Sequence, residues 1–243
     1  MNKIVPGLCE ALADIPDGAV ILIGGFGGSG NPHNLIDGLV QRGTKDLTVV
    51  SNDWTQWTSL LENGQVRKII SGFTNHPFRP QTTVLAEELC RAGKVDLETM
   101  PHGILEERIR AAKVGISALY CPVGVGTVVE EGREKKNIAG KECLLHYALK
   151  ADFALVKGYR ADRLGNIQCR FAAGNRNVTM AGAADVTIAE VEQIAEVGEI
   201  EPERVTIPGI FVDRVVKAPK VVRWLDGHEV PGYLTPKRQS PAN

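Results

Sequence analysis

The sequence predicts an α/β fold: a mostly parallel sheet flanked by helices, with an added antiparallel part. Residues 19–23 are an apolar run of strand length, and a run with no polar position is typical of a strand buried on both faces of a parallel sheet. Strand-like and helix-like segments then alternate as far as residue 120, which is the order of a sheet built from right-handed crossovers. Residues 135–138 and 142–147 flank Ala139-Gly140 as the arms of a hairpin do, and they predict the antiparallel part.

The elements of the first half follow from apolar spacing and turn residues. Helical spacing predicts a helix over residues 3–14, which the turn residues at 16–18 end. A glycine-rich loop follows the first strand, and Asn31 and Pro32 are expected as N-cap and first residue of a helix that ends at Gly43. Further strands are expected at 47–50, 66–70, 95–100 and 116–120, and helices at 54–61, 83–91 and 105–113.

The pattern changes after residue 126. Beyond the hairpin, a buried strand is expected at 153–157 and two short strands at 186–191 and 193–197. No linker separates the two halves, so we expect one domain over residues 1–217. Prolines spread through a polar stretch predict a tail over residues 218–243 that packs loosely or onto a partner.

The composition excludes several classes of protein. The chain has 243 residues, of which 43% are hydrophobic and 23% charged, which is ordinary for a globular protein and unlike a disordered, collagen-like or coiled-coil chain. A net charge of −1 without a basic stripe argues against nucleic acid as a partner. No uncharged apolar run is long enough to span a membrane, and the N-terminus carries acidic residues that a signal peptide lacks.

The cysteines indicate the cellular compartment of the protein, and the histidines bear on whether it has a metal site. Five dispersed cysteines with no Cys-x-x-Cys predict reduced thiols, mostly buried, in a cytoplasmic protein. Five dispersed histidines suggest no metal site.

The glycine-rich loop is the strongest candidate for a binding site. It consists of Gly24, Gly25, Phe26, Gly27, Gly28, Ser29 and Gly30. Glycines let the backbone approach a ligand closely, and free N–H groups where a loop enters a helix stabilise phosphate, carboxylate or a developing oxyanion. Residues 25–30 also match the short G-x-G-x-x-G pattern, with Asp53 as the candidate ribose ligand, so an NAD-binding oxidoreductase is one alternative and a ligand-free glycine turn is another.

A longer pattern around the loop resembles the signature of family I coenzyme A transferases, in the smaller A (alpha) subunit of the 3-oxoacid type. Its fixed positions are filled by Asp17, Gly18, Gly24, Gly25, Phe26, Gly30 and Pro32. The resemblance covers about residues 3–217 and includes the segments 46–52, 106–111, 151–157, 162–166 and 206–212.

This resemblance implies both a fold and a reaction. The fold is the one shared by CoA transferases and ribose-phosphate isomerases. The reaction moves CoA from succinyl-CoA or acetyl-CoA to a 3-oxoacid or short-chain acid through a glutamyl-CoA thioester. The nucleophilic glutamate of such enzymes belongs to a B subunit, so no catalytic residue is expected in this chain, and an α2β2 assembly is expected. CoA thioester is a substrate, no permanently bound cofactor is expected, and loop 24–30 is assigned to CoA and thioester contact.

Other residues have both a functional and a structural interpretation. Ser51, Asn52 and Gln81 are candidate substrate-binding residues, although Ser51 and Asn52 equally suit a turn that ends a strand. The letters Glu62-Asn63-Gly64 match the family's nucleophile motif, but their place at the end of an amphipathic segment predicts a helix terminus.

Two departures from the family pattern leave the reaction open. Asp53 stands where the family usually has Asn, and residues 73–83, with His76 as a surface histidine, are expected to form an irregular loop over the acyl pocket. A CoA-thioester hydrolase or lyase on the same fold, without a glutamyl intermediate, is therefore a second enzyme class. A non-enzymatic metabolite-binding module is the third alternative.

Overall fold

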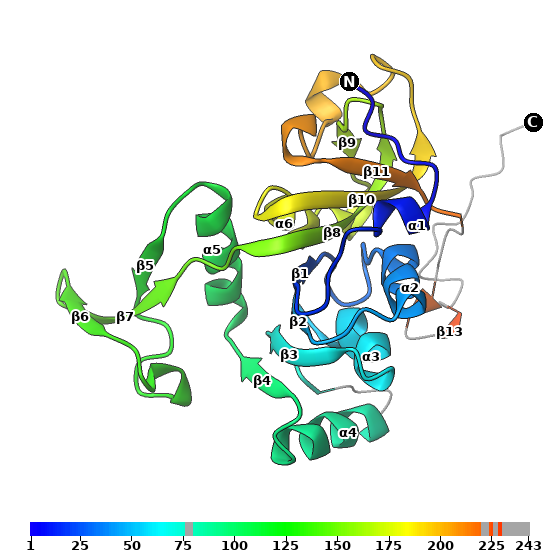
Figure 1. Cartoon of the computed structure of the whole chain (residues 1–243). Helices are drawn as coiled ribbons and strands as arrows, with labels where there is room; N and C mark the ends of the chain where they lie inside the picture. Colours follow the sequence, from blue (N-terminus) through cyan, green and yellow to red (C-terminus); the bar gives the residue numbers. More distant parts are fainter. Residues whose placement is uncertain (76–79, 220–223, 226–227, 230–243) are drawn as a thin grey trace, which may run out of the picture.

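Most strands lie in one sheet of the computed structural model, which describes residues 1–75, 80–219, 224–225 and 228–229 (Figure 1). The strand order is β11-β10-β8-β1-β2-β3-β4, with β9 beside β8. Neighbours along this order pair in parallel, and β9 pairs antiparallel with β8. The strands are β1 Val20–Ile23, β2 Leu47–Ser51, β3 Val66–Ser71, β4 Asp96–Thr99, β8 Ala151–Ala161, β9 Ile167–Gln168, β10 Ala184–Ile194 and β11 Arg214–Lys217.

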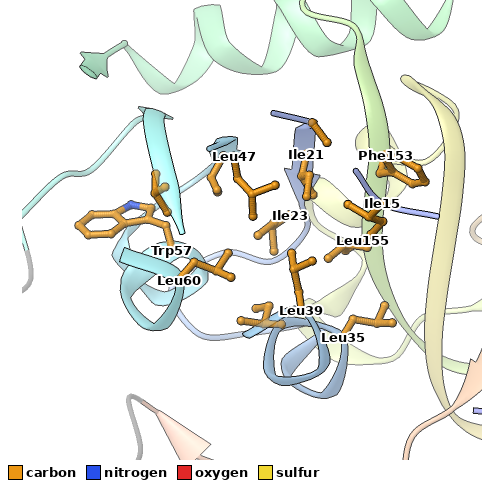
Figure 2. Packing of buried hydrophobic residues seen from close by; sticks show 14 of the residues in the cluster. Ile15, Ile21, Ile23, Leu35, Leu39, Leu47, Trp57, Leu60, Phe153 and Leu155 are labelled. Carbon is orange, nitrogen blue, oxygen red and sulfur yellow. The ribbon is translucent and has the colours of Figure 1, made fainter. Parts of the chain in front are cut away.

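Helices cover both faces of this sheet. They are α1 Leu8–Ala11, α2 His33–Arg42, α3 Trp54–Glu62, α4 Pro80–Arg91, α5 His102–Lys113 and α6 Arg176–Met180. Figure 2 shows Ile21 and Ile23 of β1 packed above α2 and α3, where Trp57 is fully buried. Leu22, which lies between them, packs in the second core with α5 and α6. Burial of β1 on both faces explains its uninterrupted apolar run and confirms the predicted sheet.

A small antiparallel sheet stands apart from the main one (Figure 1). Its order is β5-β7-β6, and its strands are β5 Ala118–Cys121, β6 Lys135–Ile138 and β7 Lys141–Tyr147. The β6–β7 hairpin is confirmed, with Ala139 and Gly140 at positive φ in its turn. The strand predicted at 116–120 was expected in the main sheet, and this was wrong. It pairs with β7 and is only half-buried, as suits a sheet packed on one side.

Several other elements differ from the predictions, two of them because of tertiary pairing. The helix expected over 3–14 is limited to α1, because Ile4 forms a parallel bridge with Val215. The two strands expected at 186–197 are the single strand β10, whose far end pairs with Arg160 and Ala161 of β8. Helices α4 and α5 each begin three residues earlier than expected, and β11 was not predicted.

Little of the predicted C-terminal tail falls within the described residues. Most of the predicted tail, residues 218–243, lies outside the described residues, apart from a short antiparallel pair, β12 Trp224–Leu225 and β13 His228–Glu229. Of the helices described here, none has the length and apolar character needed to cross a membrane. All five cysteines are free, but only Cys143 and Cys169 are buried, so the expectation of mostly buried thiols was wrong.

Candidate active site

The glycine loop leaves β1 at the point where the strand order reverses. Strands β2, β3 and β4 follow on one side of β1, and β8, β10 and β11 lie on the other. In open α/β sheets, ligands bind in the crevice at the carboxyl ends of the strands at such a switch point. The predicted binding loop, residues 24–30, therefore starts at the place where this fold class forms its sites.

The loop is a tight turn with glycines at its left-handed positions. The Phe26 amide donates to the Ser29 carbonyl at 3.0 Å, and the Ser29 amide donates back at 2.9 Å. Positive φ angles occur at Gly25, Gly27, Gly28 and Gly30. A Cβ at Gly25 would stand 1.9 Å from Asn31 Oδ1, so packing as well as conformation requires glycine there. The Phe26 ring stays half-exposed at the tip.

Asp53 ties the loop to α3. Its carboxylate accepts from the Gly27 amide at 2.7 Å, and it caps α3 by accepting from the Thr55 amide at 2.9 Å. Asn52 Nδ2 donates to the same carboxylate at 2.6 Å. Asp53 is only 3% exposed and both its oxygens are engaged inside the protein, so it does not serve as the ribose ligand that the dinucleotide alternative requires.

Two asparagines near the start of α6 hold the loop from the opposite side. Asn177 Nδ2 donates to the Gly30 carbonyl at 2.9 Å, and its Oδ1 accepts from the Lys157 amide at 2.8 Å. Asn175 Nδ2 donates to the Ser29 carbonyl at 2.9 Å. The loop is thus fixed between α3 and α6 before any ligand arrives.

The start of α2 differs from its prediction. Pro32 is the N-cap and His33 the first residue, while the Asn31 side chain bridges to Thr55 and Gln56 of α3. The helix end is capped by a distant carboxylate: Glu190 of β10 accepts from the Leu35 amide at 3.0 Å. The N-terminal end of α2 is therefore already capped by Glu190 and is not available to a ligand. The N–H groups left for a ligand belong to the loop, because the amides of Gly28 and Gly30 have no acceptor among the described residues.

Glu190 is itself compensated by a buried cation. Lys157 Nζ lies 2.9 Å from Glu190 Oε1, and both side chains are nearly inaccessible to solvent. Beside this pair, a cavity of about 140 Å³ opens next to the loop. Gly28, Gly30, His33, Lys157, Arg170 and Glu192 contribute to its lining. The Arg170 guanidinium covers the ring of Tyr159 at 4.3 Å.

The three candidate substrate-binding residues are not brought together. Ser51 Oγ donates to the Asp53 carbonyl at 3.3 Å, and Asn52 contacts Asp53 and Arg176. Both side chains are fully buried, which favours the structural interpretation. Gln81 is exposed in the first turn of α4, and this helical turn corrects the irregular loop expected as far as residue 83. Gln81 stays a prediction, and His76 lies outside the described residues.

The helix-terminus interpretation of residues 62–64 is confirmed. Helix α3 ends at Glu62, Asn63 is its C-cap and Gly64 has a φ of 66°. The Glu62 carboxylate accepts from Thr82 Oγ1 at 2.8 Å.

Sequence reasoning missed two residues beside the loop, His102 and Arg176. The His102 ring centroid lies 5.6 Å from that of Phe26. Arg176 Nε donates to Asn52 Oδ1 at 3.0 Å, its guanidinium pairs with Glu106, and its carbon centre lies 5.9 Å from the Phe26 ring. Arg176 stands between two asparagines that hold the loop, and a polar run of this kind before an apolar segment was the available signal.

Burial lowers the pKa values of two histidines in this region. Burial, followed by the positive charge of Arg176, lowers the pKa of His102. Burial likewise lowers the pKa of His33 at the start of α2, against the attraction of Glu190. An uncharged imidazole beside the loop offers hydrogen bonds without adding charge.

Comparisons of the sequence and of the structure with known proteins indicate the family of the chain. A family model described as coenzyme A transferase matches residues 7–218. The chain is 46% identical over 220 residues to the A subunit of the 3-oxoadipate CoA-transferase of Acinetobacter baylyi, covering 89% of the chain and 95% of that protein. It is 39% identical to the A subunit of a succinyl-CoA:3-ketoacid coenzyme A transferase of Helicobacter pylori, covering 90% of the chain and 94% of that protein. A crystal structure of a variant of the decarboxylase AibA/AibB matches with a TM-score of 0.76 and 27% identity, over 90% of this chain and 84% of that one.

Proposed function

The chain belongs to the coenzyme A transferase family, and on that premise we propose that it is the A subunit of an enzyme that moves CoA from succinyl-CoA or acetyl-CoA to a 3-oxoacid. The observation that carries the proposal is the match to the A subunit of a 3-oxoadipate CoA-transferase at 46% identity over 95% of that protein's length. The acceptor we propose is accordingly a 3-oxoacid such as 3-oxoadipate. Family membership leaves no support for an NAD-dependent oxidoreductase or a non-enzymatic binding module.

The reaction we propose uses a glutamate of a B subunit. Its carboxylate oxygen attacks the thioester carbonyl, and the carbon–sulfur bond breaks. CoA is released as a thiolate, and an acyl-glutamyl anhydride is formed. The thiolate then attacks the glutamyl carbonyl and releases the donor carboxylate, which leaves a glutamyl-CoA thioester. The acceptor carboxylate reverses these steps. Each addition creates an oxyanion, which is stabilised by hydrogen-bond donors that are already in position.

Loop 24–30 is our candidate for those donors and for contact with the CoA thioester. Within the described part of the chain, the amides of Gly28 and Gly30 are free to donate, and Asp53 and Asn177 hold the loop in one conformation. A loop that is fixed before binding loses little entropy when the substrate arrives. Ser51 and Asn52 support Asp53 in this scheme rather than contacting the acyl group.

The assembly and setting complete the proposal. Relatives that are named as A subunits imply a B subunit, and we propose an α2β2 complex in the cytoplasm, where the five free cysteines stay reduced. CoA enters as a substrate and not as a resident group. Residues 1–217 form the transferase domain, which is supported by the family match over 7–218.

The proposal is tested by trapping the intermediate. The chain is co-purified with the product of the adjacent reading frame, mixed with succinyl-CoA and treated with borohydride, which reduces a glutamyl thioester. Mass spectrometry is expected to locate the reduced residue on the partner, and a Glu62→Gln variant is expected to give the same result. Reduction at Glu62, or CoA transfer with no trapped glutamyl residue, would contradict the proposed mechanism.

A decarboxylase or other lyase on the same fold is the second candidate. The likeness to the AibA/AibB decarboxylase favours it, at a lower identity than the transferase relatives. A lyase would consume acyl-CoA without any acceptor acid, whereas the transferase requires one. Product analysis with and without 3-oxoadipate separates the two.

A further inference from the structure

His102, the first residue of α5, has a polar atom that the protein leaves without a partner. Its Nε2 is buried and has no hydrogen bond within the part of the chain that the structure describes. A buried polar atom without a hydrogen bond lowers the stability of a fold by about 1–3 kcal/mol. Such an atom in a native structure therefore needs an explanation, and a role in function is one.

The imidazole is held in one orientation by its neighbours. Its ring centroid lies 5.6 Å from that of Phe26 and 4.5 Å from that of Phe73. Gly72 packs so closely against the ring that a Cβ there would stand 2.5 Å from His102 Cε1. The unpaired nitrogen is therefore fixed in space and not one that rotates freely.

Arg176 determines which nitrogen carries the proton. Its Nη2 lies 3.2 Å from His102 Nδ1 and 3.3 Å from the His102 carbonyl oxygen. A guanidinium only donates, so Nδ1 must accept, and a neutral ring then carries its single proton on Nε2. Glu106 and Asn52 hold Arg176 in place, and Asp53 is the other charged group that acts on the ring.

We propose that the Nε2–H of His102 donates a hydrogen bond to the carbonyl oxygen of the bound acyl thioester and to the oxyanion formed from it, with Arg176 as its positioning residue. This inference rests on the proposed function, because it takes the acyl group to lie against Phe26. Phe26 and Phe73, whose rings flank the imidazole, are 46% and 54% exposed, so a bound acyl group can reach this part of the site from solvent. Neutral imidazole suits this role because it donates strongly without releasing a proton.

The test compares two replacements of His102 in the reconstituted complex with its partner. His102→Gln keeps an N–H donor of similar reach, and His102→Leu removes the donor at similar volume. We expect His102→Leu to lower kcat by about 10²–10³-fold with little change in KM for succinyl-CoA. His102→Gln should retain kcat within about tenfold. Equal losses in both variants at unchanged melting temperature, or full activity in His102→Leu, would overturn the proposal.

A pH profile separates donation from simple packing. Protonation of Nδ1 would break its contact with Arg176, so wild-type kcat should fall on the acid side. This acid limb should be absent in His102→Gln and should move to higher pH in Arg176→Met, where the nearby positive charge is gone. His33→Gln, a matched change at another imidazole beside the loop, should keep the limb. An acid limb unchanged in His102→Gln would contradict the assignment.

A readout independent of turnover distinguishes this inference from the proposed function. In the complex with ¹⁵N-labelled histidine, NMR should show His102 protonated at Nε2, and succinyl-CoA should shift that resonance. If the complex transfers no CoA to any acceptor, the proposed function fails while this measurement still decides the role of His102. An Nδ1-protonated ring, or a resonance that acyl-CoA leaves unmoved, would overturn the proposal.

Discussion

At the residue scale, the loop requires glycine at position 25, because a larger side chain would clash with its neighbours. Gly25 combines a φ of 115° with a clash at Asn31 Oδ1, whereas Gly43, which ends α2, has a φ of 73° and open space where a Cβ would stand. We expect Gly25→Ala to lower the free energy of unfolding by more than about 2 kcal/mol and to raise KM for acyl-CoA, and Gly43→Ala to cost about 1 kcal/mol with KM unchanged. Urea unfolding and initial rates measure both. Equal costs for the two variants would show that the clash is relieved without disturbing the loop.

The second residue-scale prediction separates the two roles of Asp53. Serine at this position still caps α3, but it is too short to reach the Gly27 amide. Asp53→Ser should therefore stay within about 1 kcal/mol of the wild type in stability while KM for acyl-CoA rises, and Asp53→Ala should lose about 1–2 kcal/mol more. Thermal or urea unfolding beside steady-state kinetics gives the comparison. A KM unchanged in Asp53→Ser would mean that the tether to the loop is dispensable.

At the element scale, a buried ion pair between Lys157 and Glu190 stabilises the N-terminal end of α2. Glu190 of β10 caps the helix, and Lys157 of β8 neutralises Glu190. Lys157→Met leaves a buried carboxylate without its cation, and we expect a loss of about 3–5 kcal/mol. The double variant Lys157→Met/Glu190→Met should recover most of this loss, less about 1 kcal/mol for the missing cap. A double-mutant cycle by chemical unfolding measures the coupling, and additive losses would contradict the ion-pair account.

Elements were predictable from sequence where local pattern decides them. The apolar run of β1, the glycine loop after it and the β6–β7 hairpin each follow from neighbouring residues. The structure of the N-terminal segment could not be predicted in this way, because Ile4 pairs with Val215, which is far away in the sequence. The start of α2 was misplaced by one residue because its cap is Glu190, a carboxylate that only the fold brings near.

At the scale of the whole molecule, neutral histidines should make the fold sensitive to acid. Burial is the main cause that lowers the pKa values of His33, His102 and His146 below 6.5, and Arg133 and Arg108 add to it at His146. The unfolded chain binds protons at these sites below pH 6.5 while the folded chain resists them, so stability is complete above pH 6.5 and falls as the pH drops. The fully buried His146 alone accounts for up to about 1.4 kcal/mol per pH unit. Urea unfolding between about pH 5 and 8 should show this decline, and a flat profile would contradict it.

The candidate site could be predicted only in part, because it is assembled by the whole fold. Loop 24–30 is contiguous and rich in glycine, so its pattern was visible in the sequence. His102 and Arg176 are far apart in sequence and look ordinary there, and they meet at Phe26 only because α5 and α6 cover the same face of the sheet. Ser51 and Asn52 were placed correctly at the end of a strand, but their burial could not be inferred without the packing around Asp53.

The central claim is that the amides of loop 24–30 hold an acyl thioester while a carboxylate from the partner protein attacks it. A crystal structure of the complex with its partner and bound acyl-CoA tests this most directly. We predict that the thioester carbonyl contacts the loop amides beside Phe26, with a partner glutamate aimed at the same carbon. A thioester bound wholly by the partner, with no atom of CoA touching the loop, would contradict the account.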